Sequence, residues 1–420
     1  MPVIIDGTNG ISGVDGSAST PAVQGTDTNT GMFFPAADTI AFAEGGTEVM
    51  RIDSSGNLRV GSSSTALNSI NSTNTFGFKN RIINGAMMID QRNAGASVTA
   101  GASITYFLDR WLYASAQASK FTIQQNAGAV TPPAGFKNYM GVTSSSAYSV
   151  LTGDYFTIDQ KIEGLNCYDL NFGTANAQTI TLSFWVRSSL TGTFAGGIYN
   201  GDAATRSYVF TYTINSANTW EYKTITIPGD TTGTWLTTTS AGMAIRFNLG
   251  GGSTYQSTAG SWQAGNYFAT SASTNIVGTN GATFYITGVQ LEKGSTATSF
   301  DYRPYGTELA LCQRYFTRFG SGVAFEAYSM GEVIGTTSIR FLMQCPVVMR
   351  SSPTLTVGGS GLVWSLDRVG TVLSSISLAQ ATTQIQSITA NTANGITIGQ
   401  VGSVTAGNFT NTSVSFSSEL

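Results

Sequence analysis

TDTNTGMFFPAADTIAFAEGGTEVMRIDSSGNLRVG, residues 26–61, is the stretch that decides the fold. Gly-rich turns divide it into three or four very short strands, which bury little surface when they pair. The stretch therefore cannot cover its own apolar side chains, which are Phe33, Phe34, Ile40, Phe42, Met50, Ile52, Leu58 and Val60. A second and third copy wound around a shared axis would cover them. This predicts an obligate homo-oligomer with a thin β-shaft.

The composition favours a β-rich protein with neutral, polar outer faces. The chain has 420 residues, enough for two to four domains. Its hydrophobic content of 41% is sufficient for buried cores, whereas its charged content of 10% lies far below the roughly 25% of ordinary domains. Disorder requires low hydrophobicity together with high net charge, and this chain has neither.

Charge and hydropathy exclude several kinds of partner. A net charge of −3 and a pI near 5.1 leave no basic surface, so we expect no nucleic acid. No run of about 18 apolar residues occurs, so we expect no membrane insertion. The start of the chain, MPVIIDGTNG, lacks a basic region followed by an apolar core, so we expect no secretory signal. The three cysteines are far apart and odd in number, which predicts free thiols such as Cys312 rather than a disulfide framework.

Period-2 alternation of apolar side chains predicts an antiparallel β-sandwich of jelly-roll type over residues 80–305. The predicted strands are 179–187, 207–214, 220–227, 243–249 and 283–291. In 102–113 we predict that Phe107, Trp111 and Tyr113 lie in the core, beside a possible pair of Asp109 with Arg110.

The last quarter of the chain is predicted to form a connector helix and a second β-sandwich at the tip, residues 306–420. The helix covers 306–316, with Thr307 as its cap and Leu309, Cys312 and Phe316 at helical spacing. Short strands are expected at 337–344, 355–357, 362–366, 396–398 and 414–416. The polar/apolar alternation in 374–400 suits strands that pack against the same strands of neighbouring chains.

Three stretches carry distinctive motifs, namely the turn at 30–35 with GGTEVMRIDSSGNLRVG at 45–61, NRIINGAMMIDQRNAG at 80–95, and VQLEKGSTATSFDYRPYGTELALCQRYF at 289–316. With these motifs the chain resembles bacteriophage tail fibre and receptor-binding proteins. The resemblance implies an intertwined homotrimer in the virion, whose residues 1–25 attach to a tail or baseplate protein. Residues 26–79 would then be the shaft with a Ser/Thr/Asn-rich linker at 62–79, and the heads would contact the host surface.

Catalysis is not expected. The absence of histidine excludes Ser-His-Asp and Cys-His mechanisms, and no zinc or phosphate-loop motif occurs. A glycosidase-like carboxylate pair among Asp154, Asp159, Glu163 and Asp169 is the remaining option. Lys161 between two of these residues favours ordinary structural carboxylates instead. No cofactor or metal is predicted, although the carbohydrate-binding jelly rolls that 140–305 resembles often hold calcium, for which Asp301 and Glu292 are conceivable ligands.

Glycan binding needs aromatic rings for the C–H faces of sugars and planar polar groups for their hydroxyls. The predicted loop 250–268 has this composition, with candidates Tyr255, Gln256, Trp262, Gln263, Asn266 and Tyr267. The alternative is that the loop packs on a neighbouring subunit with Trp262 buried there. In the tip, Trp364 and Asp367 are the second candidate site. For Trp220 and Trp235, a place in the core or in an interface is favoured over sugar contact.

The sequence thus predicts a non-enzymatic, homotrimeric fibre that adsorbs to a host surface polysaccharide or lipopolysaccharide. The alternative is a purely structural fibre or adaptor that connects the baseplate to another receptor-binding protein. A depolymerase is a third possibility.

Overall fold

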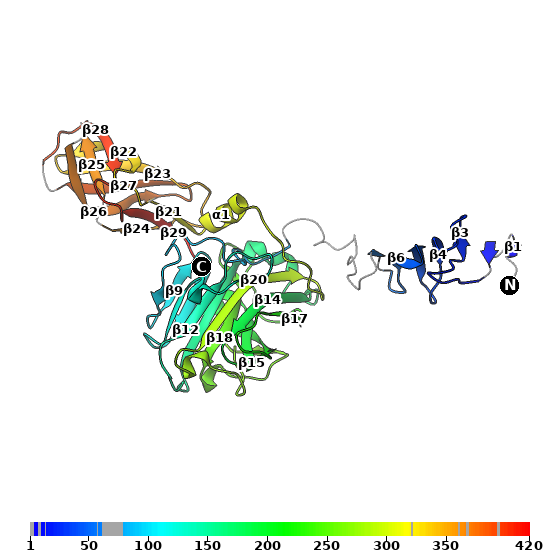
Figure 1. The fold of residues 1–420 in the computed structure, drawn as a ribbon. Helices are drawn as coiled ribbons and strands as arrows, with labels where there is room; N and C mark the ends of the chain where they lie inside the picture. Colours follow the sequence, from blue (N-terminus) through cyan, green and yellow to red (C-terminus); the bar gives the residue numbers. More distant parts are fainter. Residues whose placement is uncertain are drawn as a thin grey trace. The chain divides into compact units, whose positions relative to one another are not determined.

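The chain divides into two compact units, residues 1–79 and 80–420, which are described separately (Figure 1). The structure is a computed structural model, and it describes residues 4–6, 10–12, 14–56, 58–60, 79–320, 322–359, 362–366, 369–392 and 395–420. Among these residues the fold is almost entirely β, with a single α-helix, as the sequence predicted.

The first unit is a short antiparallel meander. Its strands are β3 (Val23–Gln24), β4 (Gly31–Phe33), β5 (Ile40–Glu44), β6 (Thr47–Ile52) and β7 (Leu58–Val60), each paired with the next along the chain. Before them, β1 (Ile4–Asp6) and β2 (Gly10–Ser12) form a hairpin. Because the strands are short, few of their side chains pack against another segment of the chain. Those that do lie on one face of the meander.

The covered face of the meander holds Phe33, Ala41 and Ala43, which pack with Ala18 of the preceding segment. The other face is apolar across all five strands. One row of directly opposed residues runs Val23, Met32, Phe42, Met50 and Val60, and a second runs Ile40, Ile52 and Leu58. Ile52 is 42% exposed and Val60 45%. We call these eight residues the open face.

Two sheets of the second unit face each other as the predicted sandwich. One has the order β19 (Trp262–Ala264), β16 (Arg206–Ile214), β15 (Gly192–Tyr199), β18 (Ala241–Gly251), β13 (Tyr155–Glu163), β10 (Trp111–Ser115) and β9 (Ile104–Leu108). The other has the order β17 (Glu221–Ile227), β14 (Ile180–Ser188), β20 (Thr283–Lys293), β12 (Met140–Ser144), β11 (Phe121–Gln125) and β8 (Val98–Thr99).

The alternation in sequence produces the sandwich core. Ile180, Leu182, Phe184 and Val186 all point inward from β14, and the inward residues of β18 and β20 meet them. Trp185 faces the other way and packs on Tyr222, with 5.3 Å between the ring centroids. The five predicted strands are thereby confirmed as β14, β16, β17, β18 and β20.

The C-terminal region differs in detail from the predicted second sandwich. Six strands close into a barrel in the order β22 (Ala327–Gly335), β23 (Ser338–Gln344), β27 (Ile385–Thr392), β26 (Val369–Ala381), β25 (Val363–Leu366) and β28 (Val401–Thr405). Beside it, β21 (Phe316–Phe319), β29 (Ser413–Ser417) and β24 (Thr354–Gly358) form a small sheet. The 13-residue β26 bends at two register shifts, which allows one sheet to close on itself.

One smaller prediction in this region was wrong. Residues 396–398 are not a strand, because the chain turns there at Gly399, whose φ is +87°. Segments within 374–400 pair with each other and with β23 of the same barrel, and their packing against neighbouring chains stays a prediction.

The helix α1 (Tyr305–Gln313) lies between the sandwich and the barrel (Figure 1). It starts after Pro304, whose fixed φ suits a helix start, so Thr307 falls inside the helix and does not cap it. Leu309 and the buried Cys312 pack with Ile83 and Ile89. No helix in the part of the chain described here is long and apolar enough to span a bilayer. All three cysteines are buried and unbridged.

Glu163, at the end of β13, connects the sandwich to the segment after α1. Its carboxylate accepts hydrogen bonds from Arg314 Nε and Nη2 at 2.9 and 2.6 Å, and from the hydroxyl of Tyr315 at 2.6 Å. Glu163 is fully buried. A buried carboxylate with three donors is satisfied, so the end of the helix is held on the sandwich.

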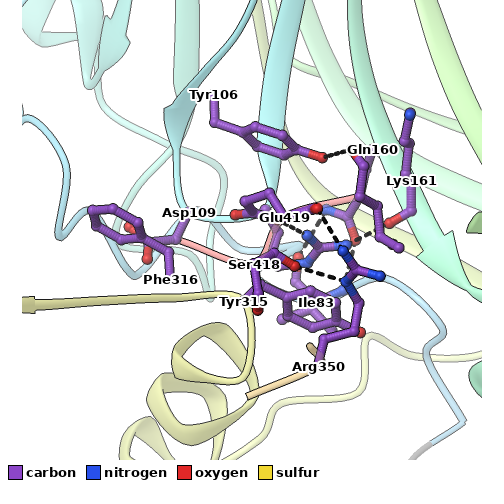
Figure 2. A network of polar contacts seen from close by, with 12 residues as sticks. Ile83, Tyr106, Asp109, Gln160, Lys161, Tyr315, Phe316, Arg350, Ser418 and Glu419 are labelled. Atoms are coloured by element: carbon purple, nitrogen blue, oxygen red, sulfur yellow. Dashed lines mark hydrogen bonds and ion pairs between the residues drawn. The ribbon is translucent and has the colours of Figure 1, made fainter. Parts of the chain in front are cut away.

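Glu419 makes the second connection (Figure 2). Arg92 Nη2 donates to Oε1 at 2.8 Å, and Arg110 Nη1 donates to Oε2. The guanidinium of Arg110 is buried and lies 3.6 Å from the ring centroid of Tyr315. Arg110 therefore pairs with a residue far along the chain and not with its neighbour Asp109, which corrects the prediction. Phe107, Trp111 and Tyr113 are buried as predicted.

Arg350, which precedes β24, also holds the C-terminal residues around Glu419 in place (Figure 2). Its Nε donates to the carbonyl of Ser418 at 2.7 Å and its Nη2 to the carbonyl of Glu419 at 2.8 Å. The amide of Ser418 donates to the carbonyl of Tyr315 at 2.8 Å. Residues 418–420 thus lie between the sandwich, the helix end and the small sheet.

Asp109 accepts hydrogen bonds from the backbone and side-chain amides of Gln91 at 2.7 and 2.6 Å. The same side-chain amide donates to the carbonyl of Phe316 in β21 at 2.9 Å. Burial raises the pKa of the Asp109 carboxyl to about 7, against the opposing effect of nearby Arg92 and of the Gln91 hydrogen bonds. Asp109, which lies where the sandwich meets β21, therefore titrates near neutrality.

We predict that Glu419→Gln lowers the free energy of unfolding of residues 80–420 by roughly 3 kcal/mol, because Arg110 would remain buried without its counter-charge. Urea unfolding followed by tryptophan fluorescence measures this, since all six tryptophans lie in 80–420. Asp202→Asn is the matched control. It removes the exposed Lys161–Asp202 pair at 3.0 Å and should cost less than about 1 kcal/mol. Equal losses in the two variants would contradict a special role for Glu419.

The raised pKa of Asp109 gives a second prediction. Between the unfolded-state pKa near 4 and the folded-state pKa near 7, the folded chain binds the additional proton. The contribution of Asp109 to stability is therefore largest at low pH and declines as the pH rises toward 7. Asp109→Asn should flatten this part of the profile when unfolding free energies are measured from pH 4 to pH 8. Parallel profiles for the two proteins would refute the assignment.

Candidate functional site

The predicted loop 250–268 is an ordered extension of the sandwich. Gly250 and Gly251 continue β18, a 3-10 turn covers Ser253–Tyr255, and β19 pairs with β16 at the edge of the sheet. The amide of Ser257 donates to the carbonyl of Ala269 at 2.9 Å. The segment is fixed in place because its backbone groups are paired along most of its length.

Several of the predicted glycan-binding residues stack on, or donate hydrogen bonds to, neighbouring residues of the fold. Tyr255 stacks on Phe268, with 5.2 Å between the ring centroids. Gln256 Nε2 donates to the carbonyl of Gly251 at 2.9 Å, and Gln263 Nε2 donates to the carbonyl of Thr258 at 2.6 Å. The aromatic ring of Tyr267 lies against Gly265. These contacts hold the segment on the sheet.

Asn266 belongs to a buried polar group on the same sheet. Its Oδ1 accepts from Arg246 Nη1 at 2.9 Å, while Arg246 Nε donates to Asp159 at 2.7 Å and Nη2 to the hydroxyl of Tyr199 at 3.1 Å. Burial lowers the pKa of Arg246, but Asp159 and Tyr199 outweigh this effect and raise it above its ordinary value. Arg246 therefore remains a fixed cation that holds Asn266.

Trp262 lies in a surface cluster of four rings, which we call the Trp262 cluster. The cluster contains Phe172, Tyr208, Trp235 and Trp262, contributed by four separate segments. The centroid distances from Trp262 are 5.3 Å to Tyr208, 5.4 Å to Trp235 and 5.7 Å to Phe172, and the last two pairs are nearly perpendicular. Phe172, Trp235 and Trp262 are half-buried, whereas Tyr208 is buried beneath them.

The indole N–H groups of the two tryptophans in the cluster donate to backbone carbonyls of neighbouring loop residues. Trp262 Nε1 donates to the carbonyl of Pro228 at 2.7 Å, and Trp235 Nε1 donates to the carbonyl of Thr232 at 3.2 Å. Each tryptophan is thus held by its polar edge while part of its surface stays accessible. Half-exposed rings fixed in this way suit a ligand with an apolar face.

A bidentate ion pair supports the loop that carries Trp235. Arg206 Nε and Nη2 donate to Asp230 at 2.8 and 2.7 Å. Burial raises the pKa of the Asp230 carboxyl, but the hydrogen bonds from Arg206 and Thr232 outweigh this effect and hold it below its ordinary value. The pair stays charged at neutral pH and fixes the loop next to the rings.

The second predicted site is not available as expected. Trp364 is only 3% exposed, because β25 directs it into the barrel, where it contacts Gly402 of β28. Its indole N–H makes no hydrogen bond within the described residues. Asp367 lies outside those residues. A tryptophan inside the barrel contributes to packing and cannot stack on a receptor sugar.

The four carboxylates weighed as catalytic are bound separately. Asp159 pairs with Arg246, and Glu163 with Arg314. Asp154 accepts from the hydroxyl of Tyr148 at 2.7 Å. Asp169 pairs with Arg81 at 2.7 Å.

The two carboxylates that share a strand are also too far apart for glycosidase chemistry. Asp159 and Glu163 are four residues apart in β13, about 13 Å at a strand's rise per residue. This exceeds the roughly 5–9.5 Å between paired glycosidase carboxylates.

The residues considered for calcium act as hydrogen-bond acceptors. Glu292 accepts from the amide and hydroxyl of Thr298 at 2.9 and 2.6 Å, and Asp301 accepts from the amide of Asn80 at 3.2 Å. The described residues include no group of three or more His, Cys, Asp or Glu side chains placed to hold a metal ion.

The sequence alone does not identify Trp235, Phe172 and Tyr208 as partners of Trp262. Trp235 was assigned to a core or an interface, and Phe172 and Tyr208 carried no site prediction. The aromatic at position 208 sits directly opposite Trp262 in the β16–β19 pairing. That pairing could not be anticipated because 250–268 was interpreted as a loop.

No family model and no curated protein matches this chain. Among solved structures it is similar to a putative sugar binding protein from Bacteroides thetaiotaomicron, at 12% identity over 51% of this chain and 100% of that one, with a TM-score of 0.31. A family 11 carbohydrate-binding module from Clostridium thermocellum in complex with a mixed-linked tetrasaccharide matches at 13% identity over 46% and 97%, with a TM-score of 0.23. TmCBM61 in complex with β-1,4-galactotriose matches at 10% over 44% and 88%, also at 0.23. Scores this low carry no argument about function.

Proposed function

We propose that this chain is a non-enzymatic bacteriophage tail fibre protein of the virion, which adsorbs to a glycan on the host surface through the Trp262 cluster. Residues 1–25 attach it to a tail or baseplate protein, and three copies assemble through the first unit. The observation that carries the glycan-binding part is the Trp262 cluster itself. It combines half-exposed, rigidly held indole rings with a neutral surrounding surface.

A sugar ring has an apolar face of C–H groups, and an aromatic ring of fixed orientation contacts such a face at little entropic cost. Trp235 and Trp262 are fixed through their indole N–H groups before any ligand arrives. Affinity at one such site is modest. Several identical sites on one particle would raise the overall affinity through avidity without further contacts.

The open face of the first unit supports self-association. Its eight apolar residues form two rows across adjacent strands, of which Val23, Ile40, Ile52 and Val60 are exposed and the other four are half-buried. An apolar sheet face of this kind is stable in water only when another surface covers it. A second and third copy of the same face supply a cover of matching shape and hydrophobicity.

The purely structural fibre remains the second candidate. One observation favours it, namely that Nε2 of Gln256, Nε2 of Gln263 and Oδ1 of Asn266 already have hydrogen-bond partners within the fold. Adsorption measurements distinguish the two candidates.

We predict that Trp262→Ala reduces binding of the full-length protein to host-surface polysaccharide by about tenfold or more, because the principal stacking ring is lost. Binding is measured on a glycan array and by surface plasmon resonance with purified host polysaccharide. Trp185→Ala is the control, since Trp185 is also half-buried on the sandwich but lies on the other sheet. Trp262→Phe should retain part of the binding. Equal binding by the wild type and Trp262→Ala, or no binding of the wild type to any host polysaccharide, would favour the structural fibre.

For the assembly, we expect native mass spectrometry of the wild type to give three times the chain mass of 44.0 kDa. Ile52→Lys places a charge on the open face and should shift the protein toward monomer, because burying an unpaired ammonium is costly. Ser55→Lys adds the same charge in the exposed turn between β6 and β7, outside both rows of this face, and should leave the trimer intact. A folded monomeric wild type at micromolar concentration would overturn the assembly.

A further inference from the structure

The two resemblance motifs of the second unit, 80–95 and 289–316, meet around a cavity of about 210 Å³. Residues 80–88 form one side, residues 300–308 another, and the turn 135–137 closes the third. The cavity belongs neither to the Trp262 cluster nor to the junction around Glu419. At roughly 30 Å³ per water it has the volume of about seven waters, which is room for one small ring but not for an extended chain.

The base of the cavity is held rigidly. Arg303 Nη1 donates to the carbonyl of Ile82 at 3.1 Å and pairs with Glu308 at 3.3 Å, while Nη2 donates to the carbonyl of Asn80. Asn80 Oδ1 accepts from the amides of Ile82 and Leu291 at 2.9 and 3.0 Å. These bonds join segments more than 200 residues apart, so the cavity is formed before any ligand binds.

Three aromatic rings form one wall. The centroids of Phe136 and Phe300 lie 5.1 Å apart, those of Phe300 and Tyr302 4.9 Å, and those of Phe136 and Tyr302 5.6 Å. Tyr302 is 58% exposed. Its hydroxyl lies over Gly135, where a Cβ would come within 2.6 Å of it, and the φ of +88° at Gly135 also favours glycine. The turn at Gly135 thereby lets Tyr302 extend across the opening.

The cavity offers polar groups beside its aromatic wall. The rim carries the hydroxyl of the exposed Tyr302 and the exposed Lys137, which makes no ion pair with any described residue. The carboxylates of Asp301 and Glu308 also line the cavity, and they lie mostly buried beside Arg303. A ligand for this cavity therefore needs an apolar part against the rings and hydroxyls toward the rim. Because the apolar wall consists of three packed rings, a methyl group suits it better than a ring bearing only hydroxyls.

We propose that this cavity is a second binding site, which takes one pyranose ring with a methyl-bearing substituent, either a 6-deoxy sugar or an N-acetylated amino sugar. The methyl group packs against Phe136, Phe300 and Tyr302, and the ring hydroxyls bond to Asp301, Glu308 and Lys137. The biological role of the site rests on the proposed adsorption to glycans, but its binding does not depend on the Trp262 cluster.

The test uses the full-length protein and three free sugars at millimolar concentration, namely L-rhamnose, N-acetylglucosamine and glucose, of which only glucose has no methyl group. Saturation-transfer NMR should show transfer to the C6 methyl of the first or the acetyl methyl of the second, and much weaker transfer to the third. Tyr302→Ala should weaken the dissociation constant of the preferred sugar by about fivefold or more, because it removes one ring of the wall.

Further variants distinguish a loss of binding in the cavity from misfolding and from a loss of binding at the Trp262 cluster. Tyr168→Ala removes an equally exposed tyrosine elsewhere on the sandwich and should leave binding unchanged. Asp301→Asn retains an acceptor for the amide of Asn80 and should weaken binding by a smaller factor than Tyr302→Ala. Trp262→Ala should lower polysaccharide binding by about tenfold or more but leave binding of the free sugars unchanged.

Three results would overturn the proposal. They are no transfer to any sugar, transfer to glucose equal to that to the two methyl-bearing sugars, or equal binding by Tyr302→Ala and Tyr168→Ala. If the free sugars bind while the wild type does not adsorb to polysaccharide, the cavity is supported as a binding site and the proposed adsorption through the Trp262 cluster is refuted.

Discussion

Two buried glutamates hold the second unit together. Glu163 bonds to Arg314 and Tyr315, and Glu419 bonds to Arg92 and Arg110. Taking these charges out of water is costly, and the cost is offset only because every carboxylate oxygen has a cationic or hydroxyl donor. These bonds join the sandwich to the end of the helix and to the C-terminal segment, so they fix how these parts meet. The position of the helix, and with it one wall of the 210 Å³ cavity, follows from this constraint.

Local patterns in the sequence were sufficient to predict the sandwich. Alternation at Ile180, Leu182, Phe184 and Val186 marks a strand with one buried face whatever its neighbours are, and the structure places all four in the core. Charge pairing could not be predicted in the same way. Arg110 has Asp109 beside it in the sequence, yet the two side chains leave the strand end in different directions. The partner of Arg110 is 309 residues away.

The candidate sites show where reasoning from the sequence ends. Trp262 was recognisable from its composition and surroundings, but its partners depend on an edge pairing with Tyr208 that no local pattern reveals. Trp364 has equally suggestive neighbours and is nevertheless buried, because barrel closure turns its face of β25 inward. The cavity could not be anticipated, since its walls come from the turn 135–137 and from two motifs that lie more than 200 residues apart.

The course of the chain through the junction has a mechanical consequence. The chain leaves the sandwich through α1 and β21 to build the barrel, and it returns through β29 to insert residues 418–420 beside Arg110 and Tyr106. The barrel is thus attached by two strands that pair with each other, rather than by one flexible tether. A pull or twist applied to the barrel is shared between both attachments. Torque then reaches the sandwich directly and is not lost in swivelling about a single linker.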